Sequence, residues 1–146
     1  MKKQLTLFVT AALLAFSIAI NNVQAQPNPD HIVTINTAYM LPADSAGRAE
    51  LRGLLKEYFD KVVSRNEFII HEWTMVHYYT DDSRELVTIS EFANWADVDK
   101  ANDRSTALEE AAWPDPKKRM EFGKKRASYI SYHKDAIYHA LPGMSK

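Results

Sequence analysis

Residues 68–92 read FIIHEWTMVHYYTDDSRELVTISEF, and this stretch decides the fold. Two runs within it, 68–80 and 84–92, are rich in β-branched and aromatic residues and are typical of strands. The polar triplet Asp81-Asp82-Ser83 between them indicates a turn. Two strands joined by so short a connection predict an antiparallel hairpin.

The segment before the hairpin predicts an amphipathic helix. Asp44 or Ser45 can cap its start. Apolar residues then recur every three or four positions, as on one buried helix face, at Leu51, Leu54, Leu55, Tyr58, Phe59, Val62 and Val63.

The segment after the hairpin predicts two shorter helices. Asn94 can cap the first, which runs toward residue 112 and should direct Trp95 inward. The sequence WPDP at 113–116 interrupts it, and Asp115 followed by Pro116 is a typical start of a new helix. We expect this last helix to continue to residue 130.

Further strands are predicted at both ends, at residues 31–41 and 131–141. The resulting order is β-α-β-β-α-β, with the second helical region broken in two. We therefore predict an α+β, ferredoxin-like fold, with helices on one face of a four-stranded antiparallel sheet. Residues 26–30 would form an extended lead-in, 31–141 the single domain and 142–146 a tail.

The first 25 residues predict a cleavable signal peptide. Lys2 and Lys3 precede an apolar run at 5–20, and Ala25 is a small residue suited to cleavage before Gln26. The alternative is an uncut membrane anchor, although the run is shorter than the ~20 residues of a spanning helix. We expect an exported protein, periplasmic or secreted, with no membrane anchor after cleavage. Because the chain has no cysteine, disulfides and thiol chemistry are excluded.

Composition limits the partners. The chain has 18 basic and 19 acidic residues, so it lacks the basic excess of general nucleic-acid-binding proteins. No dinucleotide fingerprint or phosphate-binding glycine loop is present, and we predict no cofactor. The basic run at 117–126 is interpreted as the solvent-exposed side of a helix. The alternative is a surface that binds an anionic ligand or a membrane.

The second strand predicts a homodimer. Large apolar side chains occupy both of its faces, with Ile70 and Val76 on one and Trp73 and Met75 on the other. A face with so much apolar surface is rarely left exposed to solvent. Either a ligand or the sheet of a second copy would cover it, and a monomer with an aromatic-rich surface is the alternative.

The third strand carries a family resemblance. Residues 89–95, ISEFANW, form a strand that ends in glutamate and an aromatic residue, followed by a tryptophan that opens a helix. With the order of elements, this resembles the dimeric α/β-barrel superfamily over residues 31–141. That superfamily includes antibiotic-biosynthesis-type monooxygenases, haem-degrading monooxygenases and NIPSNAP-like proteins. The resemblance implies a dimeric α/β barrel, made of two sheets packed face to face.

The resemblance also bears on the site. Enzymatic members often carry a histidine further along the helix, where this chain has Ala101, Asn102 and Asp103, and this departure disfavours haem ligation. Asn36 and Trp73 resemble, in type and placement, the polar and aromatic pocket residues of the monooxygenases.

Histidines are the natural general bases near neutral pH. The catalytic candidates are His71, His77 and Asn36, and the ligand-binding candidates are Trp73, Tyr79 and Trp95.

No metal site is predicted within one copy. His71 and His77, like His133 and His139, are six residues apart, about 20 Å along a strand. A composite site across a dimer, with Glu72 or Asp135, is the alternative.

Two functional hypotheses follow. In the first, the protein binds a small apolar or aromatic molecule between sheet and helices, with cofactor-independent monooxygenase-like activity. In the second, it is a non-catalytic dimerisation or interaction module.

Overall fold

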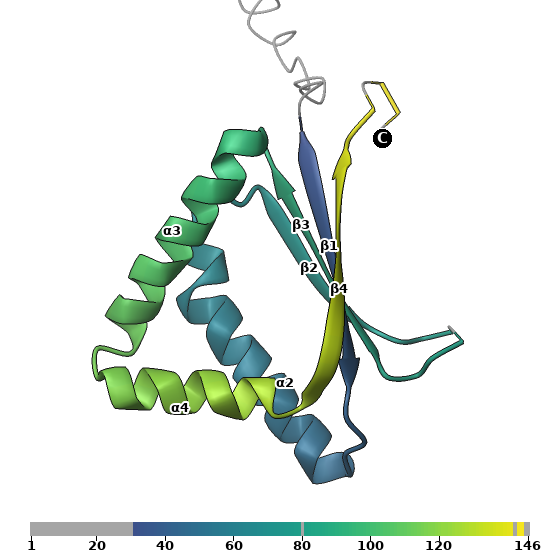
Figure 1. The fold of residues 1–146 in the computed structure, drawn as a ribbon, viewed down its shortest axis with the longest axis vertical. Coiled ribbons are helices and arrows are strands. Elements are labelled where there is room, and N and C mark those ends of the chain that lie inside the picture. Colours follow the sequence, from purple (N-terminus) through teal and green to yellow (C-terminus); the bar gives the residue numbers. More distant parts are fainter. Residues whose placement is uncertain (1–30, 80, 142, 145–146) are drawn as a thin grey trace, which may run out of the picture.

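The computed structural model describes residues 31–79, 81–141 and 143–144. Its strands and helices follow one another in the predicted order (Figure 1). In chain order the elements are β1 (Ile32–Met40), α2 (Ser45–Lys61), the 3-10 helix η1 (Val63–Arg65), β2 (His71–Val76), β3 (Glu85–Phe92), α3 (Trp95–Ala112), α4 (Pro116–Ala127) and β4 (Ile130–His139). The predicted signal peptide and lead-in lie outside the described residues. No helix within the described ranges is long and apolar enough to cross a membrane.

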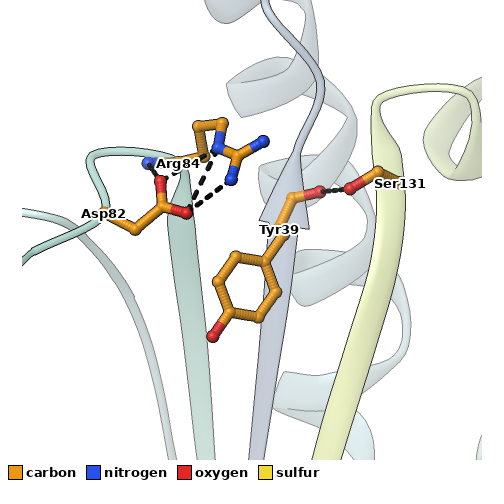
Figure 2. Close-up of polar contacts among 4 residues, drawn as sticks. All are labelled: Tyr39, Asp82, Arg84 and Ser131. Atoms are coloured by element: carbon orange, nitrogen blue, oxygen red, sulfur yellow. Dashed lines mark hydrogen bonds and ion pairs between the residues drawn. The ribbon is translucent and has the colours of Figure 1, made fainter.

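The four strands form one antiparallel sheet in the order β2-β3-β1-β4. This is the predicted ferredoxin-like arrangement, with the second and fourth strands at opposite edges. At the centre of the sheet, Asn36 of β1 lies between Thr88 of β3 and Asp135 of β4. The register of β1 with β4 shifts at Tyr39, whose carbonyl accepts a hydrogen bond from the Ser131 hydroxyl at 2.8 Å (Figure 2).

Local capping chemistry sets the helix starts, as predicted. The Asp44 side chain accepts a hydrogen bond from the backbone N–H of Gly47, and Asn94 accepts one from that of Asp97. Asp115 caps α4 directly before Pro116. Each cap satisfies a backbone donor that has no partner within its helix.

The predicted second strand was too long. It was expected at 68–80, but β2 is confined to His71–Val76. The chain turns at Asn66, which is buried and whose side-chain oxygen accepts a hydrogen bond from the backbone N–H of Phe68. Phe68 and Ile69 therefore pack into the core instead of joining the sheet. The last helix also ends earlier than predicted, at Ala127 instead of residue 130.

The packed core lies at one end of the sheet, beneath α3. Ile32 and Phe92 contact Ala101 of α3, and Phe68, Ile69 and Val98 surround them. The Asn66 amide donates hydrogen bonds to the Ala101 carbonyl at 2.8 Å and to the Ser105 hydroxyl at 2.9 Å. Because a buried amide costs free energy unless it is paired, these bonds fix the loop before β2 onto α3.

Candidate functional site

A cleft of about 880 Å³ lies between the sheet and the helices, beside the packed core. Small polar and acidic side chains from three strands line the middle of its sheet side, namely Thr34, Asn36, Glu72, Thr74, Thr88 and Ser90. Apolar strand residues, among them Ala38, Val76, Leu86 and Phe92, line the rest of that side. The helix side is lined by polar and basic side chains, among them Arg52, Lys56, Asn102 and Arg126, and by an apolar part made of Leu51, Leu55 and Phe59 of α2 and Val98 of α3. We call the polar middle of the sheet side the polar floor and the apolar part of the helix side the apolar wall. Such a combination suits a ligand that has an apolar body and a few polar groups.

The cleft stays open because α3 and α4 bend away from the sheet. Figure 1 shows the sheet on edge, with α3 and α4 as the other two sides of a triangle and α2 behind them. Pro114 ends the helical run, Trp113 stacks on Phe122 with ring centroids 4.2 Å apart, and Arg119 donates a hydrogen bond to the Trp113 carbonyl. α4 buries none of its residues, so it spans the opening without filling it.

Asn36 joins the polar floor to a histidine–carboxylate pair on the edge strand β4. Its Nδ2 donates to Asp135 Oδ1 at 2.7 Å, and His133 Nδ1 lies 3.0 Å from Asp135 Oδ2. His133 Nδ1 also lies 3.2 Å from Asn36 Nδ2, a donor that Asp135 Oδ1 already engages. We assign the proton of His133 to Nδ1, facing the Asp135 carboxylate, because two unprotonated atoms would repel at 3.0 Å, and this assignment leaves Nε2 able to accept a proton. The pair can therefore act as a base.

Glu72 is the acidic group of the polar floor. Its Oε2 accepts a hydrogen bond from the Ser90 hydroxyl at 2.9 Å. Burial raises the pKa of Glu72, and the bond from Ser90 offsets part of that rise. A carboxyl group with a raised pKa is a second candidate for proton exchange with a ligand.

The opposite face of the sheet, which we call the open face, holds a different cluster. Glu91 accepts hydrogen bonds from His31 Nδ1 at 2.6 Å and from His71 Nδ1 at 2.8 Å. Burial acts to raise the pKa of Glu91, but the two histidines outweigh it and hold that pKa below its usual range. The His71 ring also stacks on Trp73, with centroids 5.4 Å apart.

The structure does not bring the predicted site residues together. Asn36 lines the cleft, whereas His71 and Trp73 lie on the open face, because their strand partners Glu91 and Ile89 alternate with the cleft-lining residues of β3. A strand shows successive side chains to opposite faces, so adjacent candidates cannot share one cavity.

The remaining candidates lie at the periphery. His77 follows β2 and lines a smaller cavity beyond the end of the cleft. Tyr79 is 94% exposed in the connection between β2 and β3, where a strand was predicted. The prediction that Trp95 points inward was wrong, since it is 56% exposed as the first residue of α3, and Val98 one turn later makes the core contact.

Sequence reasoning missed the hydroxyl groups of the floor and the contact of Asn36 with His133 and Asp135. The signal was present as small polar residues two positions apart, Thr34 and Asn36 on one strand and Thr88 and Ser90 on another. Residues two positions apart on a strand point to the same face of the sheet. Within the described ranges, no three histidine or acidic side chains are grouped to hold a metal ion. The composite site across two copies stays a prediction.

No protein-family model matches this chain, and no curated protein matches its sequence. Solved structures do resemble its fold. A NIPSNAP family protein of unknown function from Agrobacterium tumefaciens has a TM-score of 0.57 and 14% identity, over 79% of this chain and 92% of that one.

SnoaB, a cofactor-independent oxygenase from Streptomyces nogalater, has a TM-score of 0.51 and 10% identity, over 80% of this chain and 99% of that one. A dimeric protein of unknown function with a ferredoxin-like fold, from Bacteroides fragilis, has a TM-score of 0.50 and 14% identity, over 75% and 96%. The predicted superfamily resemblance is thus confirmed at the level of the fold.

Replacing Glu72 with glutamine is expected to raise the melting temperature near pH 7. The folded protein disfavours the charged form of Glu72, so the free energy of unfolding is not reduced by this group below its unfolded pKa of 4.5 and falls as the pH rises through the higher folded pKa. Glutamine carries no charge and avoids this fall. The variant should therefore be more stable than the unchanged protein near pH 7, and this difference should disappear near pH 4. Calorimetric scans at both pH values measure this difference.

Glu67→Gln is the matched control. A backbone hydrogen bond at Glu67 and the side chain of Arg104 lower the pKa of Glu67, so this variant should show no rise near pH 7. An equal shift of Glu72→Gln at both pH values would contradict the assignment.

Proposed function

We propose that this protein binds a small, largely apolar or aromatic molecule with hydroxyl or carbonyl groups in the cleft between sheet and helices. The observation that carries the proposal is the cleft itself, about 880 Å³ with a polar floor and an apolar wall. Cavities of roughly 300–1,000 Å³ are typical of small-molecule sites. A merely structural interior would be filled by side chains, because interiors pack as densely as organic crystals.

The polar floor favours a ligand with directional groups. The hydroxyls of Thr34, Thr74 and Thr88 can each donate and accept a hydrogen bond, and Asn36 offers an amide at the centre of the sheet. A plain hydrocarbon would leave these groups unpaired, at a cost of about 1–3 kcal/mol for each one that loses water. We therefore infer phenolic or quinone-like ligands over hydrocarbons.

Cofactor-independent oxygenation is the second candidate function. It is supported by the His133–Asp135 pair beside Asn36 and by the likeness in fold to SnoaB. His133 Nε2 would accept the proton of a phenolic hydroxyl, which breaks the O–H bond and forms N–H. The resulting electron-rich anion would react with dioxygen and would itself supply the electrons. A non-catalytic binding module is the alternative.

We also propose that two copies pair through the open face into a dimeric α/β barrel. Outside the Glu91 cluster much of that face is apolar, and its apolar side chains include Val33, Ile35, Trp73, Met75, Val87, Ile89, Tyr132 and Tyr138. Trp73 is 48% exposed and Tyr138 is 55% exposed, which is costly in water for large rings. A two-fold axis through this face would cover both surfaces at once. The dimeric neighbour from Bacteroides fragilis supports the proposal.

Export remains a proposal that rests on the sequence. Lys2, Lys3 and the apolar run up to residue 20 support it, with cleavage after Ala25. N-terminal sequencing of the protein recovered outside the cytoplasm should begin at Gln26, and an intact Met1 would exclude cleavage.

Ligand binding is tested by filling the cleft. Thr88→Phe places a ring at the centre of the polar floor, so binding of a quinol and polyphenol panel, measured by thermal shift, should be lost while the protein stays folded. Thr106→Phe, on an exposed position of α3, is the matched control and should bind as the unchanged protein does. Equal binding by both variants would place the ligand elsewhere.

Oxygenation is tested by oxygen uptake with any ligand that binds. His133→Gln is expected to slow uptake by about 10²–10⁴-fold, the usual contribution of a general base, while ligand affinity changes little. Asp135→Asn should slow it as well, because the tautomer of His133 is no longer fixed. Binding without any uptake by the unchanged protein would favour the non-catalytic module.

Dimerisation is tested at the centre of the open face. Ile89 lies between Ile35 and Trp73, so Ile89→Lys would bury an unpaired charge in the interface and weaken the dimer by roughly two orders of magnitude. Sedimentation velocity measures the change. Ala107→Lys on the exposed surface of α3 is the control, and a monomeric unchanged protein would exclude the dimer.

A further inference from the structure

The main cleft continues toward the start of α2. A cavity of about 170 Å³, which we call the side cavity, shares the main cleft's lining residues Leu51, Arg52, Leu55, Val76 and Leu86. A neighbouring cavity of about 330 Å³ shares Met40, Arg48, Leu51 and Ser83 with the side cavity. The three spaces therefore follow one another along α2, and a ligand in the cleft can extend into the side cavity.

Two arginines of α2 line this extension. Arg48 and Arg52 are four residues apart, so they lie on the same side of the helix. The lysines further along α2 are paired, Lys56 with Asp60 and Lys61 with Glu57. For the part of the chain that the structure describes, neither Arg48 nor Arg52 has a side-chain hydrogen bond or an ion pair.

Three acidic side chains at this end of the molecule, those of Asp82, Glu50 and Asp44, already have partners. Figure 2 shows Arg84 turned toward Asp82, which it holds through Nε at 2.9 Å and Nη2 at 2.6 Å. Glu50 accepts hydrogen bonds from Lys125 and Tyr129 across the gap to α4. Asp44 caps α2 through the backbone N–H of Gly47. The positive charge of Arg48 and Arg52 is thus not balanced by these neighbours.

We infer that Arg48 and Arg52 bind the carboxylate of an organic acid whose apolar body lies in the main cleft. The guanidinium group presents N–H donors in a planar fork that matches a carboxylate, and charged hydrogen bonds of this kind are about twice as strong as neutral ones. The apolar body would lie against Leu51, Leu55 and Val76, which connect the two spaces. This inference rests on the proposed function and narrows the ligand class to apolar carboxylates.

The test compares two competitors that differ only in charge. The neutral dye N-phenyl-1-naphthylamine, which fluoresces in apolar surroundings, reports occupation of the main cleft. Displacement of the dye by 2-naphthoate and by 2-naphthamide is then measured at fixed ionic strength, since salt screens exposed charges. For the unchanged protein, the carboxylate should displace the dye at an about tenfold lower concentration than the amide, which corresponds to roughly 1.4 kcal/mol.

The double variant Arg48→Gln, Arg52→Gln should lose that tenfold preference while its affinities for the dye and the amide stay unchanged. Arg65→Gln, an exposed arginine of η1 outside all three cavities, is the matched control and should keep the preference. An equal loss in the control would show a general charge effect and overturn the inference. A melting temperature within the range of the control verifies that the double variant is folded.

Failure of this inference is distinguishable from failure of the proposed function. If the dye does not bind and neither competitor changes the melting temperature, the cleft is not a ligand site and both proposals are wrong. If the dye binds and the two competitors displace it equally well, the proposed function holds and the carboxylate site is wrong.

Discussion

Strand alternation determines what each face of the sheet can do, and most features of this protein follow from it. A sheet that helices cover on one side ordinarily places its apolar residues beneath them. Here the middle of the covered face carries Thr34, Asn36, Thr74 and Thr88, while the open face carries the branched and aromatic residues. A packed cluster forms where Ile32 and Phe92 meet α3, and Ala38, Leu51 and Leu86 are buried toward the other end of the sheet.

The helices that cover the sheet are interrupted between α3 and α4. Pro114 separates α3 from α4, and the Trp113–Phe122 stack braces the bend between them. α3 stays on the core through Ala101 and Asn66, whereas α4 crosses the opening without a buried residue. The cluster beneath α3 is packed, whereas the space between α4 and the sheet is left open for a ligand.

Each face of the sheet carries its own group of histidine and carboxylate side chains. Glu91 gathers His31 and His71 on the open face, and Asp135 holds His133 on the covered face. In the proposed dimer the first cluster would lie at the interface between copies, whereas the second is exposed on β4 and contacts the cleft residue Asn36. This is why the candidate base moves from the second strand to the fourth, although the histidines of the second strand have the aromatic neighbours that suggested a site.

The sequence by itself determined the order of the elements, their caps and the break between the last two helices. These features depend on neighbouring residues, as when Asp115 and Pro116 start α4 or when apolar residues repeat every three or four positions along α2. Periodicity in a strand defines two faces but does not say which one the helices cover. The sequence therefore could not show that Trp73 and Asn36 lie on opposite faces of the sheet. The contact of Asn36 with His133, 97 residues away, exists only because β4 pairs with β1. The tertiary structure alone decided which face is covered and which distant residues meet there, because both depend on the pairing of whole strands.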